Sequence, residues 1–315
     1  MTARPRDGVV AIAIAAVLLA GVGLDVWGPK VSAEPAVERD EASFRARAVF
    51  CPPALGKPAG RMTVTAAPAG DVPVTVGFEP ASQERSELSP GTILQHQPLS
   101  AEAPEVVGYG GPVAATVVTS IDAPVSAVGA AACAPEASTR WFFPEGNSTV
   151  THDERLMIYN PFPDEAVVRV TLLTPGGELA KAGLTDVAVP SESSITLALE
   201  ENLLERRILG AVVSAARGRV VAWRLSIARP DELPSGIQFT LGATELADTW
   251  YFPEGAVGTG FEERISILNP STDEATVDVT LVSASSSVPG TEVRVPPRST
   301  TAITLDDAAL AGERG

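Results

Sequence analysis

The chain is poor in the residues on which most catalytic and metal sites depend. Only two of its 315 residues are histidine, and only two are cysteine. His96 and His152 fall in different predicted modules, which argues against a Ser-His-Asp triad and against a histidine-rich zinc site. No glycine-rich phosphate loop follows a predicted strand. We therefore expect no catalytic residue, no cofactor and no metal ion, in a protein that is not an enzyme.

Positive charge is also scarce. Asp and Glu number 39 against 23 Lys and Arg, so the net charge is -16. A charge of this sign repels phosphate backbones and excludes nucleic acid as a partner. The basic residues are almost all arginine, and Ala, Val, Gly and Pro are abundant. This pattern is typical of GC-rich coding, and we expect an actinobacterial source.

A long apolar run occurs at residues 8–24, after two arginines. At 1.5 Å per residue it would span roughly 26 Å as a helix, close to the thickness of a membrane core. We predict a cytoplasmic n-region at 1–7, a signal anchor or transmembrane helix at 8–24 and a linker at 25–47. The basic flank then leaves the C-terminal part extracytoplasmic, with a single pass through the cell membrane. Cleavage at the small residues 31–33 is the alternative and would make the protein secreted.

Cys51 and Cys133 are the only cysteines. In an exported protein an even pair favours a disulfide, and this one would clasp the two ends of the first predicted module. Two buried free thiols are the alternative. A catalytic thiol is disfavoured because neither histidine lies in an obvious paired context.

A segment of domain length occurs twice. The matching parts keep a constant offset of 109 residues: 141–146 with 250–255, 154–161 with 263–270, and 168–172 with 277–281. A repeat of this length predicts tandem modules. Within it, apolar residues alternate with polar ones, as at Val277, Val279 and Leu281, which is the pattern of half-buried strands. The predicted fold class is therefore all-β, with tandem immunoglobulin-like β-sandwich modules after a single N-terminal hydrophobic helix.

The register of the repeat predicts three modules. They are a divergent, disulfide-clasped module at 48–139, a β-sandwich repeat at 140–248, and a second copy at 249–315 that is incomplete at its C-terminal end. This second copy has no counterpart of the hairpin at 210–228. We expect either a truncated product or a module that another chain completes by donating the missing strands.

Weaker matches extend the register beyond the two copies. In the divergent module, 116–119 and 125–128 are aligned with 211–214 and 220–223 of the repeat. These alignments predict that the divergent module has the same final hairpin. In the second copy, 303–305 are aligned with 195–197.

Four residues recur in both copies and are predicted to form the scaffold of the repeat. They are Trp141, Glu145, Arg155 and Asn160 in the first copy and Trp250, Glu254, Arg264 and Asn269 in the second. We expect each glutamate to pair with the arginine of its own copy and so to hold a turn against a strand. We expect both tryptophans to pack in cores, with a sugar-stacking platform as the alternative.

Three further motifs are interpreted as structural. Residues 152–154 (His-Asp-Glu) are the one ligand-like cluster, and because the second copy lacks the histidine we expect a solvated loop. The acidic pairs 164–165 and 273–274 have no spaced oxygen ligands around them, which disfavours calcium. Residues 147–149 (Asn-Ser-Thr) match a glycosylation acceptor that the second copy also lacks.

Several features together resemble an actinobacterial family, the domain-of-unknown-function family five-seven-one-nine. They are the apolar N-terminus, Cys51-Pro52, Cys133 shortly before an aromatic triplet that ends in Pro-Glu-Gly, and the Leu-x-Ile-x-Asn-Pro strand. The resemblance covers nearly everything after the apolar run, and the chain departs from the pattern at its abrupt end. It implies a membrane-anchored or secreted protein. Because the family has no established activity, it transfers no catalytic residue.

These observations predict a non-enzymatic extracytoplasmic protein of the cell envelope with a structural or adhesive role. Repeated modules on an anchor can space or present a binding surface without chemistry at any single residue. The expected partners are the membrane, through the N-terminal helix, and an envelope protein or glycan. One alternative is a carbohydrate-binding module that uses Trp141 and Trp250. The other, disfavoured, is an envelope hydrolase, which would need two carboxylates at glycosidase separation.

Overall fold

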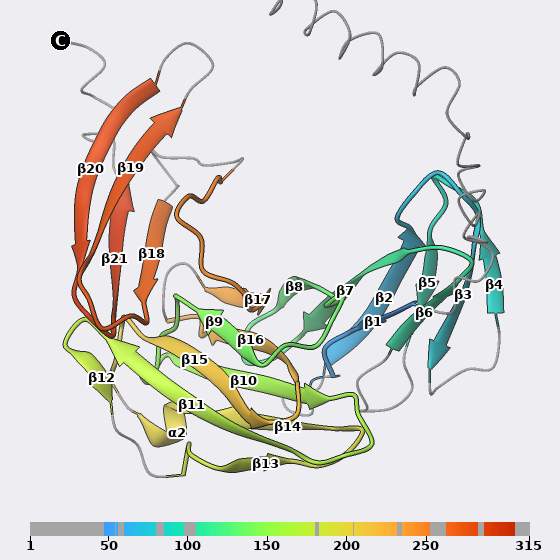
Figure 1. The fold of residues 1–315 in the computed structure, drawn as a ribbon, viewed down its shortest axis with the longest axis horizontal. Coiled ribbons are helices and arrows are strands. Elements are labelled where there is room, and N and C mark those ends of the chain that lie inside the picture. Colours follow the sequence, from blue (N-terminus) through green and yellow to red (C-terminus); the bar gives the residue numbers. More distant parts are fainter. Residues whose placement is uncertain are drawn as a thin grey trace, which may run out of the picture. The chain divides into compact units, whose positions relative to one another are not determined.

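The structure is a computed structural model, drawn in Figure 1. It describes residues 47–53, 55, 60–79, 85–97, 105–179, 183–203, 205–231, 235–252, 263–282 and 287–305. The predicted n-region, membrane helix and linker, apart from Arg47, lie outside these residues, and so does Glu254. Within the described ranges, no helix has the length and apolar character needed to cross a membrane.

Nearly all of the described chain is β-structure, which confirms the all-β class. The strands fall into three groups, called the first, middle and C-terminal units. The first unit contains β1 (Arg47–Phe50), β2 (Gly60–Pro68), β3 (Val74–Glu79), β4 (Arg85–Leu88), β5 (Leu94–His96), β6 (Glu105–Tyr109), β7 (Val113–Ile121) and β8 (Ala127–Ala132). The middle unit contains β9 (Arg140–Phe143), β10 (His152–Asn160), β11 (Ala166–Thr174), β12 (Gly177–Leu179), β13 (Val187–Val189), β14 (Ser193–Ala198), the short helix α2 (Leu199–Asn202), β15 (Gly210–Arg217), β16 (Val221–Ala228) and β17 (Gly236–Leu241). The C-terminal unit contains β18 (Glu263–Asn269), β19 (Ala275–Val282), β20 (Ser287–Val295) and β21 (Ser299–Leu305).

The first and middle units have the same antiparallel topology. The first unit pairs its strands in the orders β1-β6-β3-β4 and β5-β2-β7-β8, and the middle unit in the orders β9-β15-β11-β12 and β14-β10-β16-β17, with β13 also on β11. The hairpins β6–β7 and β15–β16 therefore occupy the same place, with one strand in each sheet. The alignment of 116–119 with 211–214 is wrong by one strand, because 116–119 lie in β7, the counterpart of β16. Short alternating strands resemble one another, and only their pairing identifies them.

The core of the first unit lies between its two sheets. Val76 and Val106 from one sheet and Val64 and Val117 from the other are fully buried in one cluster. In β7, buried and exposed residues alternate along the strand, as expected for a sheet with one covered face. Cys51 and Cys133 form the predicted disulfide, which joins the segments that follow β1 and β8.

The middle unit contains a sheet that is buried on both faces. Along β16 the buried residues run almost without interruption, unlike the alternating pattern of β7. The register places Leu156 beside Arg224 on one face and Met157 beside Trp223 on the other. A strand covered on both sides reads as a continuous buried run, because successive side chains point to opposite faces.

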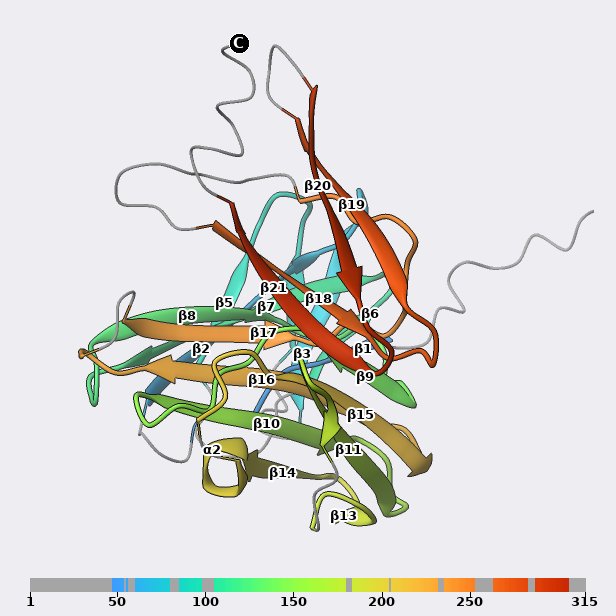
Figure 2. The same cartoon turned by 90° about the vertical axis from the view of Figure 1, so that its left-hand side faces the viewer.

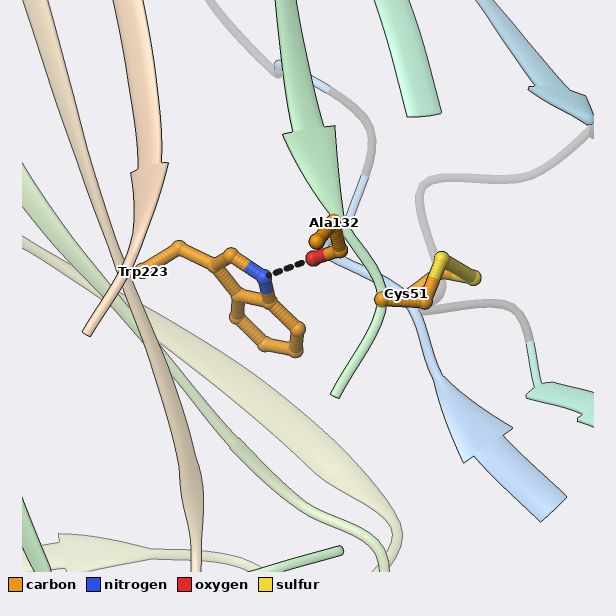
Figure 3. Close-up of a disulfide and its surroundings, with 4 residues drawn as sticks. Cys51, Ala132 and Trp223 are labelled. Carbon is orange, nitrogen blue, oxygen red and sulfur yellow. Dashed lines mark hydrogen bonds between the residues drawn. A yellow bond between two sulfur atoms is a disulfide. The ribbon is translucent and has the colours of Figure 1, made fainter. Parts of the chain in front are cut away.

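The second face of this sheet packs against the first unit. Figure 2 shows β8, β17, β16, β10 and β14 side by side. Trp223 is fully buried, and its indole Nε1 donates a hydrogen bond of 3.1 Å to the carbonyl oxygen of Ala132, next to the disulfide (Figure 3). Tyr159 donates a 2.6 Å hydrogen bond to Glu105. One hydrophobic cluster therefore runs from Ile121 of the first unit through the middle unit.

The C-terminal unit consists of two two-stranded sheets, β18–β21 and β19–β20, drawn in orange and red in Figure 1. They correspond to β10–β14 and β11–β13 of the middle unit. Asn269 lies opposite Ser299 as Asn160 lies opposite Ser193, and Ile265 lies opposite Ile303 as Leu156 lies opposite Leu197. The alignment of 303–305 with 195–197 is therefore wrong, because the register places Ile303 at the position of Leu197.

Candidate functional site

The two conserved positions of the repeat with the clearest role are Asn160 and Asn269. Both side chains are buried and close the same turn. The amide nitrogen of Asn160 lies 2.8, 3.2 and 3.1 Å from the carbonyl oxygens of Asp164, Val189 and Pro190. That of Asn269 lies 2.8, 3.0 and 3.1 Å from those of Asp273, Val295 and Pro296. Each asparagine thus binds the backbone carbonyl oxygens of its turn, including the buried one of Val189 or Val295, which is a structural role.

A cluster of charged and polar residues links the middle unit to the C-terminal unit. It is built around Arg224 of β16, which is 4% exposed. The guanidinium lies 3.2 Å from a carboxylate oxygen of Glu145 and 3.6 Å from one of Glu154, and it donates a 2.6 Å hydrogen bond to Gln238. Arg264 of the C-terminal unit donates a 2.9 Å hydrogen bond to the other oxygen of Glu145. These five residues form the charge cluster.

The two carboxylates of the charge cluster have opposite pKa shifts. Burial raises the pKa of Glu154 to about 7, against the attraction of Arg224 and hydrogen bonds from Ser226 and the backbone of Asn147. Burial also acts on Glu145, but the charges and hydrogen bonds of Arg224, Arg264 and Gln238 outweigh it and lower its pKa. Glu154 is thus the proton-binding member of the charge cluster near neutral pH.

The predicted pair between Glu145 and Arg155 is wrong. Arg155 instead approaches Glu200 of α2, at 4.0 Å. The reason is the period of the strand: Glu154 and Arg155 are neighbours on β10 and point to opposite faces. Glu154 shares its face with Arg224, which therefore takes the place expected for Arg155. In the second copy Glu254 lies outside the described residues, and Arg264 forms an ion pair with Glu145 of the middle unit.

His152 begins β10 and is half-buried, not solvated in a loop as predicted. Its Nδ1 lies 3.1 and 3.2 Å from the hydroxyls of Thr149 and Thr151, and its Nε2 lies 3.3 Å from the amide of Asn147. Asn147 also accepts bonds from the backbone and hydroxyl of Thr149. The asparagine amide is thus engaged in an internal network, which disfavours it as a glycan acceptor. Among the described residues, no three His, Cys, Asp or Glu side chains gather as a metal site would require.

The aromatic triplets at 141–143 and 250–252 differ in their exposure to solvent. Trp141 is 1% exposed, and Phe142 and Phe143 are buried with it, as expected for core residues. Trp250 was expected to be buried in the same way, but it is 58% exposed, and Tyr251 and Phe252 are 89% and 67% exposed. Contiguous exposed aromatics on a soluble surface commonly mark a binding site.

A hollow of about 310 Å³ lies beside Trp250. Its lining combines apolar side chains with two acids: Pro135, Glu136, Trp141, Leu241, Glu245 and Trp250. Neither Glu145 nor Glu154 lines it, so the charge cluster and the hollow are separate places. The carboxylates of the charge cluster form ion pairs with arginines, whereas the hollow and the aromatic triplet at 250–252 are accessible to solvent.

Residues 93–314 match the model of a family described as a family of unknown function (DUF5719), and the chain belongs to that family. This confirms the family identified from the sequence, although the match begins at residue 93 and leaves out the apolar N-terminus and Cys51-Pro52. No curated protein and no solved structure matches the chain.

Proposed function

We propose that this member of the DUF5719 family is a non-enzymatic scaffold protein of the cell envelope, built of tandem immunoglobulin-like modules, that binds a partner through its C-terminal unit. The proposal rests on a difference in exposure between the aromatic triplets of the two copies. In the middle unit the triplet at 141–143 is buried, whereas in the C-terminal unit the triplet at 250–252 is exposed. Exposed aromatics are typical anchors of protein interfaces.

A spacing role is supported by the contacts that hold the units to one another. The first and middle units share one hydrophobic cluster. Arg298 of the C-terminal unit donates a 2.6 Å hydrogen bond to Glu178, and the buried Thr300 donates one of 2.9 Å to the carbonyl oxygen of Pro144. Gly210 leaves so little space that a Cβ there would lie 2.5 Å from Leu268. Contacts of this kind present the C-terminal unit in a defined orientation.

An extracytoplasmic location is supported by the disulfide, since such bonds persist in oxidising compartments. The apolar run at 8–24 supports the same location, with a membrane anchor as the means of retention. Proteolysis of intact cells tests this part. We expect an external protease to degrade the full chain without lysis, and protection until lysis would contradict the proposal.

Crosslinking in the producing cells tests the interaction role. A photoreactive residue at position 251, where Tyr251 is exposed, is expected to give a discrete protein adduct on irradiation. The matched control places the same residue at Val150, which is also exposed, at 65%, but lies in the middle unit. Equal adducts at both positions, or none at position 251, would argue against a binding role for the C-terminal unit.

Glycan binding is the second candidate, favoured by the hollow beside Trp250. An exposed indole next to the carboxylates of Glu136 and Glu245 offers a stacking surface and hydrogen-bond acceptors for a sugar. Retention of the full chain on purified cell-wall glycan tests it, with Trp250→Ala as the loss variant. Equal retention of Trp250→Ala and the unmodified chain would remove this candidate.

A further inference from the structure

The hollow beside Trp250 has walls from two segments that are distant in sequence. Strands β8 and β17 lie side by side (Figure 2), and the segment that follows each of them forms one wall. Glu136 comes from the first wall and Glu245 from the second. The buried Trp141 and the exposed Trp250 also line the hollow. The strand pairing therefore brings two carboxylates and two tryptophans to one place.

Backbone hydrogen bonds hold the first wall on both sides of Glu136. The backbone N–H of Ala134 donates a 2.7 Å hydrogen bond to the carbonyl oxygen of Phe50. The backbone N–H of Ser138 donates one of 2.9 Å to the carbonyl oxygen of Val220. Glu136 lies in the short segment between these two anchored residues, so its backbone is fixed by both the first and the middle unit.

The second wall is held against β9. The backbone N–H of Phe142 donates a 2.8 Å hydrogen bond to the carbonyl oxygen of Ala243, and that of Ala243 returns one of 3.1 Å. A Cβ at Gly242 would lie 2.6 Å from the ring of Phe143, so the backbone packs directly on that ring. Glu245 follows two residues after Ala243. Walls that are already fixed cost little conformational entropy when a ligand binds.

The lining of the hollow is chemically suited to a cation. Apart from Glu136, Glu245 and Thr244, the described residues that line it are apolar or glycine, and none of them is basic. A carboxylate attracts a positive charge, and so does the face of an indole ring, because of its quadrupole. An anion would use neither attraction. The hollow therefore favours a positively charged group on an apolar stem.

The arginines of the described chain pair with other acids. Glu145 and Glu154 share Arg224, and Glu165 is bound by Arg217. None of the ion pairs formed within the described ranges involves the two carboxylates of the hollow. The net charge of the chain is -16, which attracts a basic partner from a distance.

We propose that the hollow receives an arginine side chain from the surface of a partner protein. This inference rests on the proposed function, in which the partner contacts the exposed aromatic triplet. The guanidinium stacks on the indole of Trp250 and donates hydrogen bonds to the carboxylates of Glu136 and Glu245. Arginine fits these groups better than lysine, because its planar head both stacks on aromatic rings and binds carboxylates through two parallel hydrogen bonds.

The size of the hollow agrees with a single side chain. Its volume of about 310 Å³ is at the lower end of the range for ligand pockets, which is about 300–1,000 Å³. Arginine is also enriched among the residues that contribute most to protein interfaces. A neutral sugar could stack on Trp250 without using the two charges. Dependence on charge therefore separates the arginine site from the glycan candidate.

Titration of the full chain with a short peptide tests the proposal. The chain carries fluorotryptophan, and Trp250→Phe identifies the fluorine NMR signal of Trp250. The probe is acetyl-glycyl-arginyl-glycine amide, and its control has citrulline, the neutral isostere, in place of arginine. We expect a saturable shift of the Trp250 signal with a dissociation constant on the order of 1 mM, and binding of the control at least about tenfold weaker. No saturable shift with the probe, or equal binding of both peptides, would overturn the proposal.

Neutral substitutions measure the share of each carboxylate. Glu136→Gln and Glu245→Gln each remove one charge, and we expect each to weaken binding of the arginine peptide about threefold and the double variant about tenfold. Added salt should weaken binding to the unmodified chain more than to the double variant. The matched control is Glu201→Gln, because Glu201 is exposed on α2, away from the hollow. Equal weakening by Glu201→Gln and by the double variant would indicate general attraction to an acidic chain and contradict the site.

The outcomes distinguish this inference from the proposed function. If the arginine peptide does not bind but crosslinking at position 251 still gives a protein adduct, the arginine site is wrong and the interaction role stands. If a soluble fragment of cell-wall glycan shifts the Trp250 signal and the arginine peptide does not, the hollow is a glycan site and the proposal fails. If the arginine peptide shifts the signal and suppresses the adduct at position 251, both are supported.

Discussion

The middle and C-terminal units carry similar strand sequences in two different environments. Val170 on β11 is 4% exposed, while Val279 at the equivalent position on β19 is half-buried. Both strands have a partner on one side, β13 or β20, but only β11 has β15 on the other. Apolar alternation therefore predicts which face of a strand is inward, and the neighbouring strand determines how far that face is removed from water.

The hairpin β15–β16 gives the middle unit a buried arginine as well as apolar cover. Arg224 comes from β16 and lies between the carboxylates of Glu145 and Glu154. The C-terminal unit keeps Glu263 at the position of Glu154, on a half-buried strand. Comparing the loss of stability caused by substitutions in the two units therefore tests how much the stability of the middle unit depends on the hairpin β15–β16.

The largest effect is expected from Arg224→Ala. Removing one partner of a buried ion pair leaves uncompensated charge, which costs about 3–5 kcal/mol in the free energy of unfolding. Urea denaturation of the full chain measures the loss. The matched control is Arg217→Ala, since Arg217 lies on the same hairpin in an exposed pair with Glu165 and should cost less than about 1 kcal/mol. Equal losses would mean that the charge cluster does not stabilise the middle unit.

The pH dependence of stability should identify Glu154. Its pKa is raised from 4.5 to about 7 in the folded state, so the folded chain holds an extra proton between these values. Its contribution to stability is fully present below about pH 4.5 and is lost as the pH rises to about 7, a difference of about 3 kcal/mol. Urea midpoints between pH 5 and 8 for the unmodified chain and for Glu154→Gln measure it. Parallel curves for the two proteins would show that Glu154 does not titrate in this range.

Substitution of the two asparagines compares the scaffold of the two units directly. Asn160→Ala and Asn269→Ala each remove contacts to three backbone carbonyl groups, one of them buried, and we expect each to cost about 2 kcal/mol locally. Amide hydrogen exchange should show faster opening of β10 in the first variant and of β18 in the second. If Asn269→Ala left β18 unchanged, the C-terminal unit would not depend on the shared scaffold.

The smallest effect is expected at the contacts of the C-terminal unit with the middle unit. Arg264→Ala and Arg298→Ala remove partly exposed ion pairs with Glu145 and Glu178, each worth less than about 1 kcal/mol. Arg294→Ala is the control, because Arg294 pairs with Glu292 on its own strand. We expect slightly faster exchange in β18 and β21 for the first two variants only. A larger loss of stability from Arg264→Ala or Arg298→Ala than from Arg224→Ala would contradict the expected order of effects.

Local patterns in the sequence predicted the features that depend on neighbours along the chain. Alternation at Val277, Val279 and Leu281 predicted a strand with an inward face, and the recurrence of Asn160 as Asn269 predicted a shared scaffold residue. The disulfide was predicted from an even pair of cysteines in a chain that was expected to be exported. The partner of Glu145 could not be predicted in this way, because Arg224 is 79 residues away and reaches it only through the pairing of β16 with β10.

The errors have a common origin in strand pairing. Arg155 was assigned to Glu145 by proximity in the repeat, but neighbouring residues on β10 point to opposite faces. The strand at 116–119 was assigned to the wrong partner because β7 resembles β15 in composition. Trp250 was expected in a core because Trp141 is in one. In each case the prediction used the residue types correctly, but the sequence did not show which strand lies beside the residue in question.

The sequence by itself determined the all-β class, the repeat, the cysteine pair and the family. The tertiary structure alone decided that Arg224 joins the two carboxylates, that the sheet containing β16 is buried on both faces, and that Trp250 is exposed while Trp141 is buried. The physical reason is that secondary structure follows from the period of apolar residues along the chain, whereas burial and ion pairing depend on strands that are distant in sequence and adjacent in space.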